Sequence, residues 1–262
     1  MEFFTHHPIW LFLAAFLVLW LACLAGTWLR PRDADAEAKK DDLAILLGAT
    51  LTLLALIIGF SFSMAIGRYD QRKNYEEAEA NAIGTEYLRA DVLPAANAEA
   101  ARRLLRLYTD ERIKFYVLED ESVRAKNDAR TAQTQNDLWA AVRAPANGEP
   151  TPITALAVAG MNDVINSQGY SQAAAWNRIP VAAWGFMMAI ALCCTVLFGY
   201  GSRDVQAARQ LAFMLPLIIS IAFLLIADID APIHGLIHVT PQNLRALAQS
   251  LRPPPAASNP GG

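Results

Sequence analysis

Charged residues are gathered in blocks along this chain, and four long stretches between the blocks contain no Asp, Glu, Lys or Arg. These stretches are strongly apolar and cover residues 9–29, 43–67, 180–201 and 211–227. A helix rises about 1.5 Å per residue, and the hydrocarbon core of a bilayer is about 30 Å thick. The first three stretches exceed that thickness, and the fourth, with 17 residues, lies at the lower limit. The pattern therefore predicts four transmembrane helices.

The block between the second and third stretches, residues 68–179, has a different pattern. It carries 14 Lys and Arg with 16 Asp and Glu, and it lacks the alternation of apolar and polar residues that is typical of strands. We expect helices over residues 68–92, 97–143 and 153–176, with Asn97 as an N-cap and with breaks at the intervening prolines. The block is thus predicted to be a soluble helical domain.

The predicted fold class is an all-α integral membrane protein with four transmembrane helices and a soluble helical domain inserted between the second and the third. The expected parts are a first transmembrane hairpin (1–67), the soluble domain (68–179), a second hairpin (180–228) and a C-terminal tail (229–262). The last part of the tail, which includes Pro253, Pro254 and Pro255, is expected to be disordered. An even number of spans places both termini and the helical domain on one side of the membrane.

Composition supports the membrane assignment and excludes several classes of function. The chain is 54% hydrophobic and 18% charged, which is more apolar than an average soluble domain. Its net charge of −3 leaves no basic surplus for a nucleic-acid backbone. Cys23, Cys193 and Cys194 lie inside apolar runs, so they form no disulfide framework or CxxC motif. GxSxG, Walker A and GxGxxG motifs are absent from the sequence, and we expect neither an enzyme nor a cofactor.

The second stretch contains two four-residue repeats. One is made of small residues, which allow helix backbones to approach closely in lipid: Ala55, Gly59, Ser63 and Gly67. The other lies beside it on the same helix: Thr52, Leu56 and Phe60. One interpretation is that the second line fills a bundle core or contacts lipid. The other is that several copies of the helix surround an axis, where the line forms a hydrophobic constriction that gates by wetting and dewetting.

Several short segments spread over the chain form a distinctive set of motifs. Residues 56–70, LIIGFSFSMAIGRYD, are similar to the end of the bestrophin pore helix, where a Gly-Phe pair precedes a short apolar turn and an Arg-aromatic pair. Further matching segments are EANAIG (79–84), YLRAD (87–91), NRIP (177–180) with Trp184, and DID (228–230) with Pro232, Gly235 and Val239. Together these segments resemble the bacterial bestrophin-like family more specifically than the bestrophins themselves.

The resemblance implies a homo-oligomer, expected to be a pentamer, that is assembled around the second helix. It places Thr52, Leu56 and Phe60 on the pore-lining positions of the neck. Only Phe60 has the aromatic character expected there, and Thr52 departs from the large apolar type. The resemblance also implies a bacterial inner (plasma) membrane location with the termini and the helical domain in the cytosol. Lys and Arg residues near the spans divide almost evenly between the two faces and do not set this orientation.

Polar residues near the ends of the spans are further candidates for contact with ions. Asn81, Arg68 and Arg89 would line a vestibule and attract anions if the second helix continues and faces the axis, whereas solvated or paired charges are the ordinary alternative. Asp228 and Asp230 stand where animal bestrophins carry an acidic calcium clasp. Calcium takes about 6–8 oxygen ligands, so we favour interfacial capping at the Pro232 turn over a metal site.

We expect an oligomeric channel that conducts small ions through an axis lined by the second helix. Its partners would be other copies of the chain, the lipid bilayer and small ions. The alternative is a non-conducting, membrane-anchored scaffold or sensor whose helical domain binds partners, because packing alone also explains the stripe of small residues. A secondary transporter has only Pro216 in its favour, since no pair of broken spans is evident.

Overall fold

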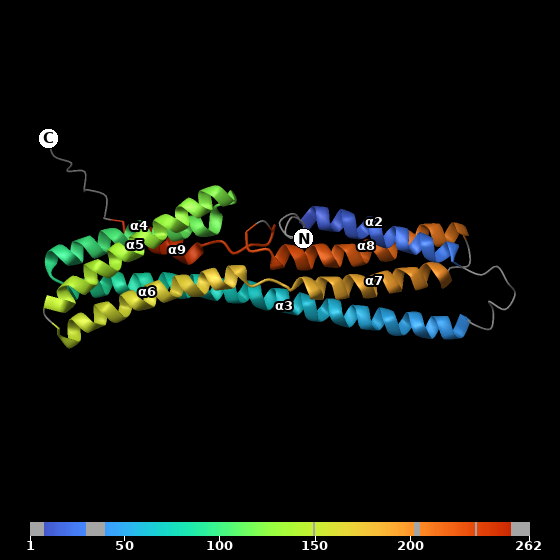
Figure 1. Ribbon diagram of the computed structural model, residues 1–262, viewed down its shortest axis with the longest axis horizontal. Helices are drawn as coiled ribbons and strands as arrows, with labels where there is room; N and C mark the ends of the chain where they lie inside the picture. Colours follow the sequence, from blue (N-terminus) through green and yellow to red (C-terminus); the bar gives the residue numbers. More distant parts are fainter. Residues whose placement is uncertain (1–7, 30–39, 149, 202–204, 234, 253–262) are drawn as a thin grey trace, which may run out of the picture. The chain divides into compact units, whose positions relative to one another are not determined.

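The computed structural model describes residues 8–29, 40–148, 150–201, 205–233 and 235–252 (Figure 1). Within these ranges all regular structure is helical. The helices are α2 (Pro8–Trp28), α3 (Lys40–Arg89), the 3-10 turn η2 (Ala90–Val92), α4 (Ala95–Val117), α5 (Glu121–Gly148), α6 (Pro152–Trp176), α7 (Val181–Gly201), α8 (Val205–Asp230) and α9 (Gln242–Ser250). Four of them, α2, α3, α7 and α8, cover the predicted spans except for Leu29 and Pro180, and four helical segments are long and apolar enough to cross a bilayer.

The described residues divide into two compact units. The membrane unit comes from residues 1–69 and 177–238, and the helical unit comes from residues 70–176 and 239–262. Helix α3 is continuous and contributes its first part to the membrane unit and its second part to the helical unit. Helix α9, which the sequence analysis leaves in the C-terminal tail, belongs to the helical unit.

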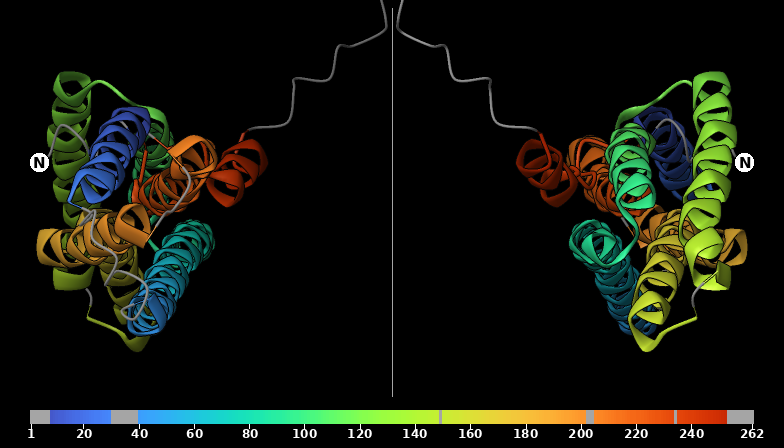
Figure 2. Two further views of the ribbon diagram at one scale, coloured as in Figure 1. Left: turned by 90° about the vertical axis from the view of Figure 1, so that its right-hand side faces the viewer. Right: turned by 90° about the vertical axis from the view of Figure 1, so that its left-hand side faces the viewer.

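In the membrane unit, α2 packs closely against α7 and α8, as the end-on view in Figure 2 shows. Two glycines set the crossing of α2 and α7. A Cβ atom on Gly26 would overlap the carbonyl oxygen of Val196, and one on Gly199 would overlap that of Cys23. Only glycine permits such backbone contact, which gives two apolar helices a close packing surface in lipid. Larger apolar side chains, including Leu19 and Phe223, fill the core of this unit.

The predicted continuous helix over residues 97–143 is wrong, because the chain turns at residues 118–120 between α4 and α5. The two helices lie side by side as a hairpin (Figure 1). Asp120 stabilises the start of α5, since its Oδ1 accepts hydrogen bonds from the backbone N–H groups of Ser122 (2.8 Å) and Val123 (3.0 Å). Asp is a favoured N-cap, and the acidic run that contains it marks a helix start and not a solvated helix interior.

Both ends of that predicted helix also differ in the structure. Helix α4 starts at Ala95 and α5 continues through Pro145 to Gly148. A proline within a helix leaves the carbonyl group four residues earlier without its usual donor. Here that carbonyl belongs to Ala141, and the side-chain amide of Asn97 donates a hydrogen bond to it at 3.2 Å. Asn97 is therefore not an N-cap of α4, and it supplies the donor that Pro145 lacks.

Candidate functional site

Helix α3 has two opposite faces within the membrane unit. Leu54, Ser61 and Ala65 are buried, and Leu54 and Ala65 pack into the apolar cores formed with α7 and α8. These residues follow one another at intervals of seven and four. With about 100° of rotation per residue, they lie roughly half a turn from Leu56 and Phe60. The predicted pore-lining line therefore lies on the face that the protomer leaves uncovered.

The three pore-lining candidates are all exposed in the protomer. The Leu56 side chain is 53% exposed and that of Phe60 is 64% exposed. Thr52 is exposed as well, and its hydroxyl donates a hydrogen bond to the carbonyl oxygen of Gly48 at 2.8 Å. The one proton of the Thr52 hydroxyl is thus used within the helix. This position presents a less polar surface than the residue type alone indicates.

The stripe of small residues is also exposed, and the described residues leave open space beside its two glycines. Ala55, Gly59, Ser63 and Gly67 are all exposed, and a Cβ atom added to Gly59 or Gly67 would meet no atom within 4 Å. Within one protomer, close helix packing instead occurs at Gly26 and Gly199. A packing role for the stripe therefore stays a prediction, and it concerns contacts between copies.

Arg68 does not stand free beside the exposed line. Its Nη1 lies 3.3 Å from the Oδ1 atom of Asp230 at the end of α8, and both side chains are largely buried. The other oxygen of Asp230 accepts a hydrogen bond from the backbone N–H of Ile179 at 2.9 Å. Asp230 therefore neutralises Arg68 and fixes the start of α7 against the middle of α3 and the end of α8.

Asp228 acts as an acceptor for the backbone after α8. Its two carboxylate oxygens accept hydrogen bonds from the N–H groups of Leu236 (2.7 Å) and Ile237 (2.9 Å). A Cβ atom on Gly235 would overlap the Asp228 carbonyl oxygen, which explains the glycine in this turn. Within the described ranges there is no cluster of three His, Cys, Asp or Glu side chains suited to a metal ion. These oxygens are already committed to N–H donors, so the residues fit capping better than calcium binding.

The exposed line continues beyond the membrane segment at seven-residue intervals. Two interleaved rows are exposed: Leu56, Ser63, Asp70 and Glu77, and Phe60, Gly67, Asn74, Asn81 and Leu88. Asn81 thus shares a face of α3 with Phe60, as the vestibule hypothesis requires. Arg89 lies instead against Gly160 of α6. The charged residues of these two rows, Asp70 and Glu77, are acidic, and their spacing from Leu56 is a signal in the sequence that could have identified them.

Buried charged residues on the opposite face of α3 organise the helical unit. Glu79 pairs with Arg112 of α4, and both side chains are fully buried. The Ser171 hydroxyl of α6 donates to Glu79 Oε2 at 3.0 Å, and the Tyr116 hydroxyl donates to the same oxygen at 3.4 Å. Burial, and then the Glu79 charge, raises the pKa of Tyr116 above its usual value, so its phenol stays a donor.

A second buried carboxylate on this face holds α9. Glu76 accepts hydrogen bonds from the backbone N–H of Leu244 (2.9 Å) and from the Asn243 side chain (2.7 Å). It thereby satisfies N–H groups at the start of α9, where the helix dipole favours negative charge. The helical period that places Leu54, Ser61 and Ala65 on one face places Glu76 and Glu79 on the same face. This periodicity is the signal in the sequence that could have identified the two buried carboxylates.

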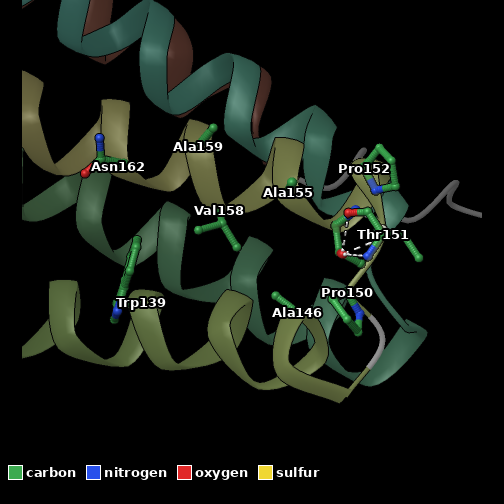
Figure 3. Close-up of a pocket in the computed structure, with 10 residues that line it drawn as sticks. Trp139, Ala146, Pro150, Thr151, Pro152, Ala155, Val158, Ala159 and Asn162 are labelled. Carbon is green, nitrogen blue, oxygen red and sulfur yellow. Dashed lines mark hydrogen bonds between the residues drawn. The ribbon is translucent and has the colours of Figure 1, made fainter.

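A surface groove of about 640 Å³ lies where α5 turns into α6 (Figure 3). Its lining includes Trp139, Val158 and Ala159, and none of the described side chains that line it is charged. These side chains therefore offer an apolar surface and no charged group for acid–base chemistry or metal binding. It is separate from the predicted site residues on α3.

Comparison with known proteins identifies the fold. A family model described as the bestrophin-like domain matches residues 10–244. Two crystal structures of a bacterial bestrophin homologue from Klebsiella pneumoniae, one of a variant and one solved by zinc phasing, share this fold. The variant has a TM-score of 0.65 and 12% identity over 94% of this chain and 95% of that chain, and the other has 0.61 and 13% over 93% and 95%. No curated protein matches the sequence. From the match over most of its length, this integral membrane protein belongs to the bestrophin-like family.

Proposed function

We propose that several copies of this chain, five in our preferred arrangement, surround an axis with the exposed face of α3 innermost, and that ions pass along this axis down their gradient. The observation that carries the proposal is the burial of α3. Its most apolar 18-residue window is only 6% buried in the protomer, against 50% for α8. An apolar helix with so little cover needs lipid or other copies around it, and membership of a family named after bestrophins favours copies.

The residues on the uncovered face favour an axis over lipid. Helices approach closely in membranes through small residues. On this face Ser63 is exposed, and the space beside Gly59 and Gly67 is open among the described residues. A surface that contacted only lipid would not need them. Between these small residues, Leu56 and Phe60 are the large apolar side chains that would form rings around the axis. Such rings narrow a pore and control its wetting.

The test is ion flux into liposomes that contain the purified protein. Phe60→Ala is expected to raise or otherwise alter the flux, because it removes the largest side chain of the constriction. Phe186→Ala is the matched control, since Phe186 is 58% exposed but lies on α7. Absence of flux in every ion gradient would refute conduction, and equal effects of the two substitutions would refute the constriction.

Particle mass in mild detergent separates this proposal from the scaffold alternative. A ring of several copies is expected for the channel. A monomer or dimer would favour a non-conducting anchor whose helical unit binds other proteins, for which the uncharged groove beside Trp139 is the available apolar surface. We further propose that the protein lies in the bacterial plasma membrane with its termini and helical unit in the cytosol, as family resemblance implies.

A further inference from the structure

Glu86 is a buried carboxylate on α3 that has no hydrogen-bond partner among the described residues. Its side chain is 1% exposed, and neither carboxylate oxygen has a hydrogen-bond partner. Glu76 and Glu79, on the same face of the helix, each accept several hydrogen bonds. Leaving an ionised carboxylate buried without donors is costly, and such a group usually stays neutral instead.

Glu86 lies at a close contact between α3 and α6 within the helical unit. A Cβ atom on Gly160 of α6 would overlap Oε2 of Glu86, so the carboxyl group is in direct contact with the α6 backbone. Gly160 is itself buried. Water therefore has little room to enter and solvate a charge at this crossing.

Two charged residues act on the Glu86 carboxyl group, one from each helix. Arg89, one turn further along α3, favours the ionised form, and Asp163 of α6 opposes it. Burial outweighs both and raises the pKa of Glu86 to about 8. The carboxyl group is consequently neutral at and below neutral pH, and it ionises in mildly alkaline conditions.

We propose that Glu86 is a protonation-dependent lock between α3 and α6, in which the neutral acid allows the two helices to pack and the ionised form loosens them. Helix α3 also carries Leu56 and Phe60, so the state of the lock would regulate ion passage. This regulatory part rests on the proposed function, whereas the lock itself does not.

The sign of the pH effect follows from the two states. An unfolded chain loses this proton near pH 4.5, while the folded protein keeps it until about pH 8. The stabilising contribution is therefore complete at low pH, declines as the pH rises between these values and levels off once both states are ionised. Glu86→Gln keeps the shape of the neutral acid and cannot ionise.

The first experiment compares thermal unfolding of the detergent-solubilised wild type and Glu86→Gln from about pH 5 to about pH 9, which covers most of the expected decline and extends roughly one unit above the titration of the folded protein. The Tm of the wild type is expected to fall relative to that of the variant as the pH rises. Glu99→Gln, an exposed carboxylate on α4, is the matched control and is expected to follow the wild type. Parallel curves for wild type and Glu86→Gln would overturn the lock.

Infrared spectroscopy gives a second, independent measurement of the same group. A protonated carboxylic acid band is expected at neutral pH, is lost in alkaline buffer and is absent from Glu86→Gln. A wild-type spectrum without this band overturns the lock even if Glu86→Gln folds poorly.

Flux in liposomes tests the regulatory part. The flux of the wild type is expected to change as the pH on the side of the helical unit passes about 8, and that of Glu86→Gln is expected to stay constant. If both respond equally, regulation through Glu86 is refuted. If neither conducts under any condition, the proposed function fails, while the Tm and infrared results still decide whether the lock exists.

Discussion

Individual residues on α3 take their roles from the face on which they lie. The exposure of Leu56 and Phe60 could be expected from spacing alone, because it depends only on the helical period. The same spacing places Glu79 on the opposite, buried face, but its pairing with Arg112 could not be expected, because the two residues are 33 positions apart in the sequence. Local charge spacing indicates a solvated face for Glu86 and Arg89, and the structure buries Glu86 because α6 supplies a glycine there.

The Glu79–Arg112 pair gives a prediction at the residue scale. Both side chains are fully buried, so removing one partner leaves the other as an uncompensated charge. Arg112→Leu should destabilise the helical unit by about 3–5 kcal/mol. Combining it with Glu79→Leu should restore much of that loss, because neither charge then remains buried. Chemical denaturation of both variants checks this, and a double variant no more stable than the single one would contradict the explanation.

Helix elements are predicted well where one helix can be recognised without its neighbours. Each transmembrane helix can be predicted from the sequence because its length and apolar character are set by the thickness and polarity of the bilayer alone. The turn between α4 and α5 was missed because it is only three residues long and because buried residues recur at helical spacing both before and after it. The passage of α5 through Pro145 was missed because the compensating donor, Asn97, belongs to another helix.

Capping by Asp120 yields a prediction about pH at the scale of an element. Hydrogen bonds from Ser122, and then from the backbone of Val123, lower the pKa of Asp120. Its contribution is thus present above the ordinary aspartate range and is lost as the pH falls through the lowered value. Asp120→Ala should lower the Tm at neutral pH, and the difference from the wild type should shrink in acid. Glu119→Ala, an exposed neighbour, should show no such pH-dependent difference.

The exposed face of α3 beyond the membrane segment predicts which ions are favoured. The charged residues of its two exposed rows are Asp70 and Glu77. The exposed Lys73 lies beside these rows, and Arg68 is paired with Asp230. If this face lines the axis, negative charge concentrates cations there. Glu77→Gln should lower the preference for cations over anions by about 1 kcal/mol, roughly fivefold, in low salt. Reversal potentials in bilayers measure this, with Glu99→Gln as the control. An unchanged ratio would show that Glu77 lies away from the ion path.

At the scale of the whole molecule, the four-span plan follows from the sequence, whereas the assembly of copies does not. The bilayer imposes the same requirement on every chain, so each transmembrane helix can be recognised from its own segment of the sequence. In the proposed assembly the uncovered α3 face packs against other copies, and their position depends on surfaces that one chain shows only as exposed. The stripe of Gly59, Ser63 and Gly67 indicates close packing without saying on what.

Chemical accessibility of α3 distinguishes an axis from a lipid-facing surface. We would replace Cys23, Cys193 and Cys194 and then introduce single cysteines at Phe60 or Phe186, which are both largely exposed in the protomer. A charged, membrane-impermeant thiol reagent needs water to reach and ionise its target thiol. If copies of α3 surround a wetted path, the reagent should modify Phe60→Cys and reduce flux, while Phe186→Cys in lipid should resist it. Equal resistance at both positions would place Phe60 in the lipid tails, and the proposed axis would then be wrong.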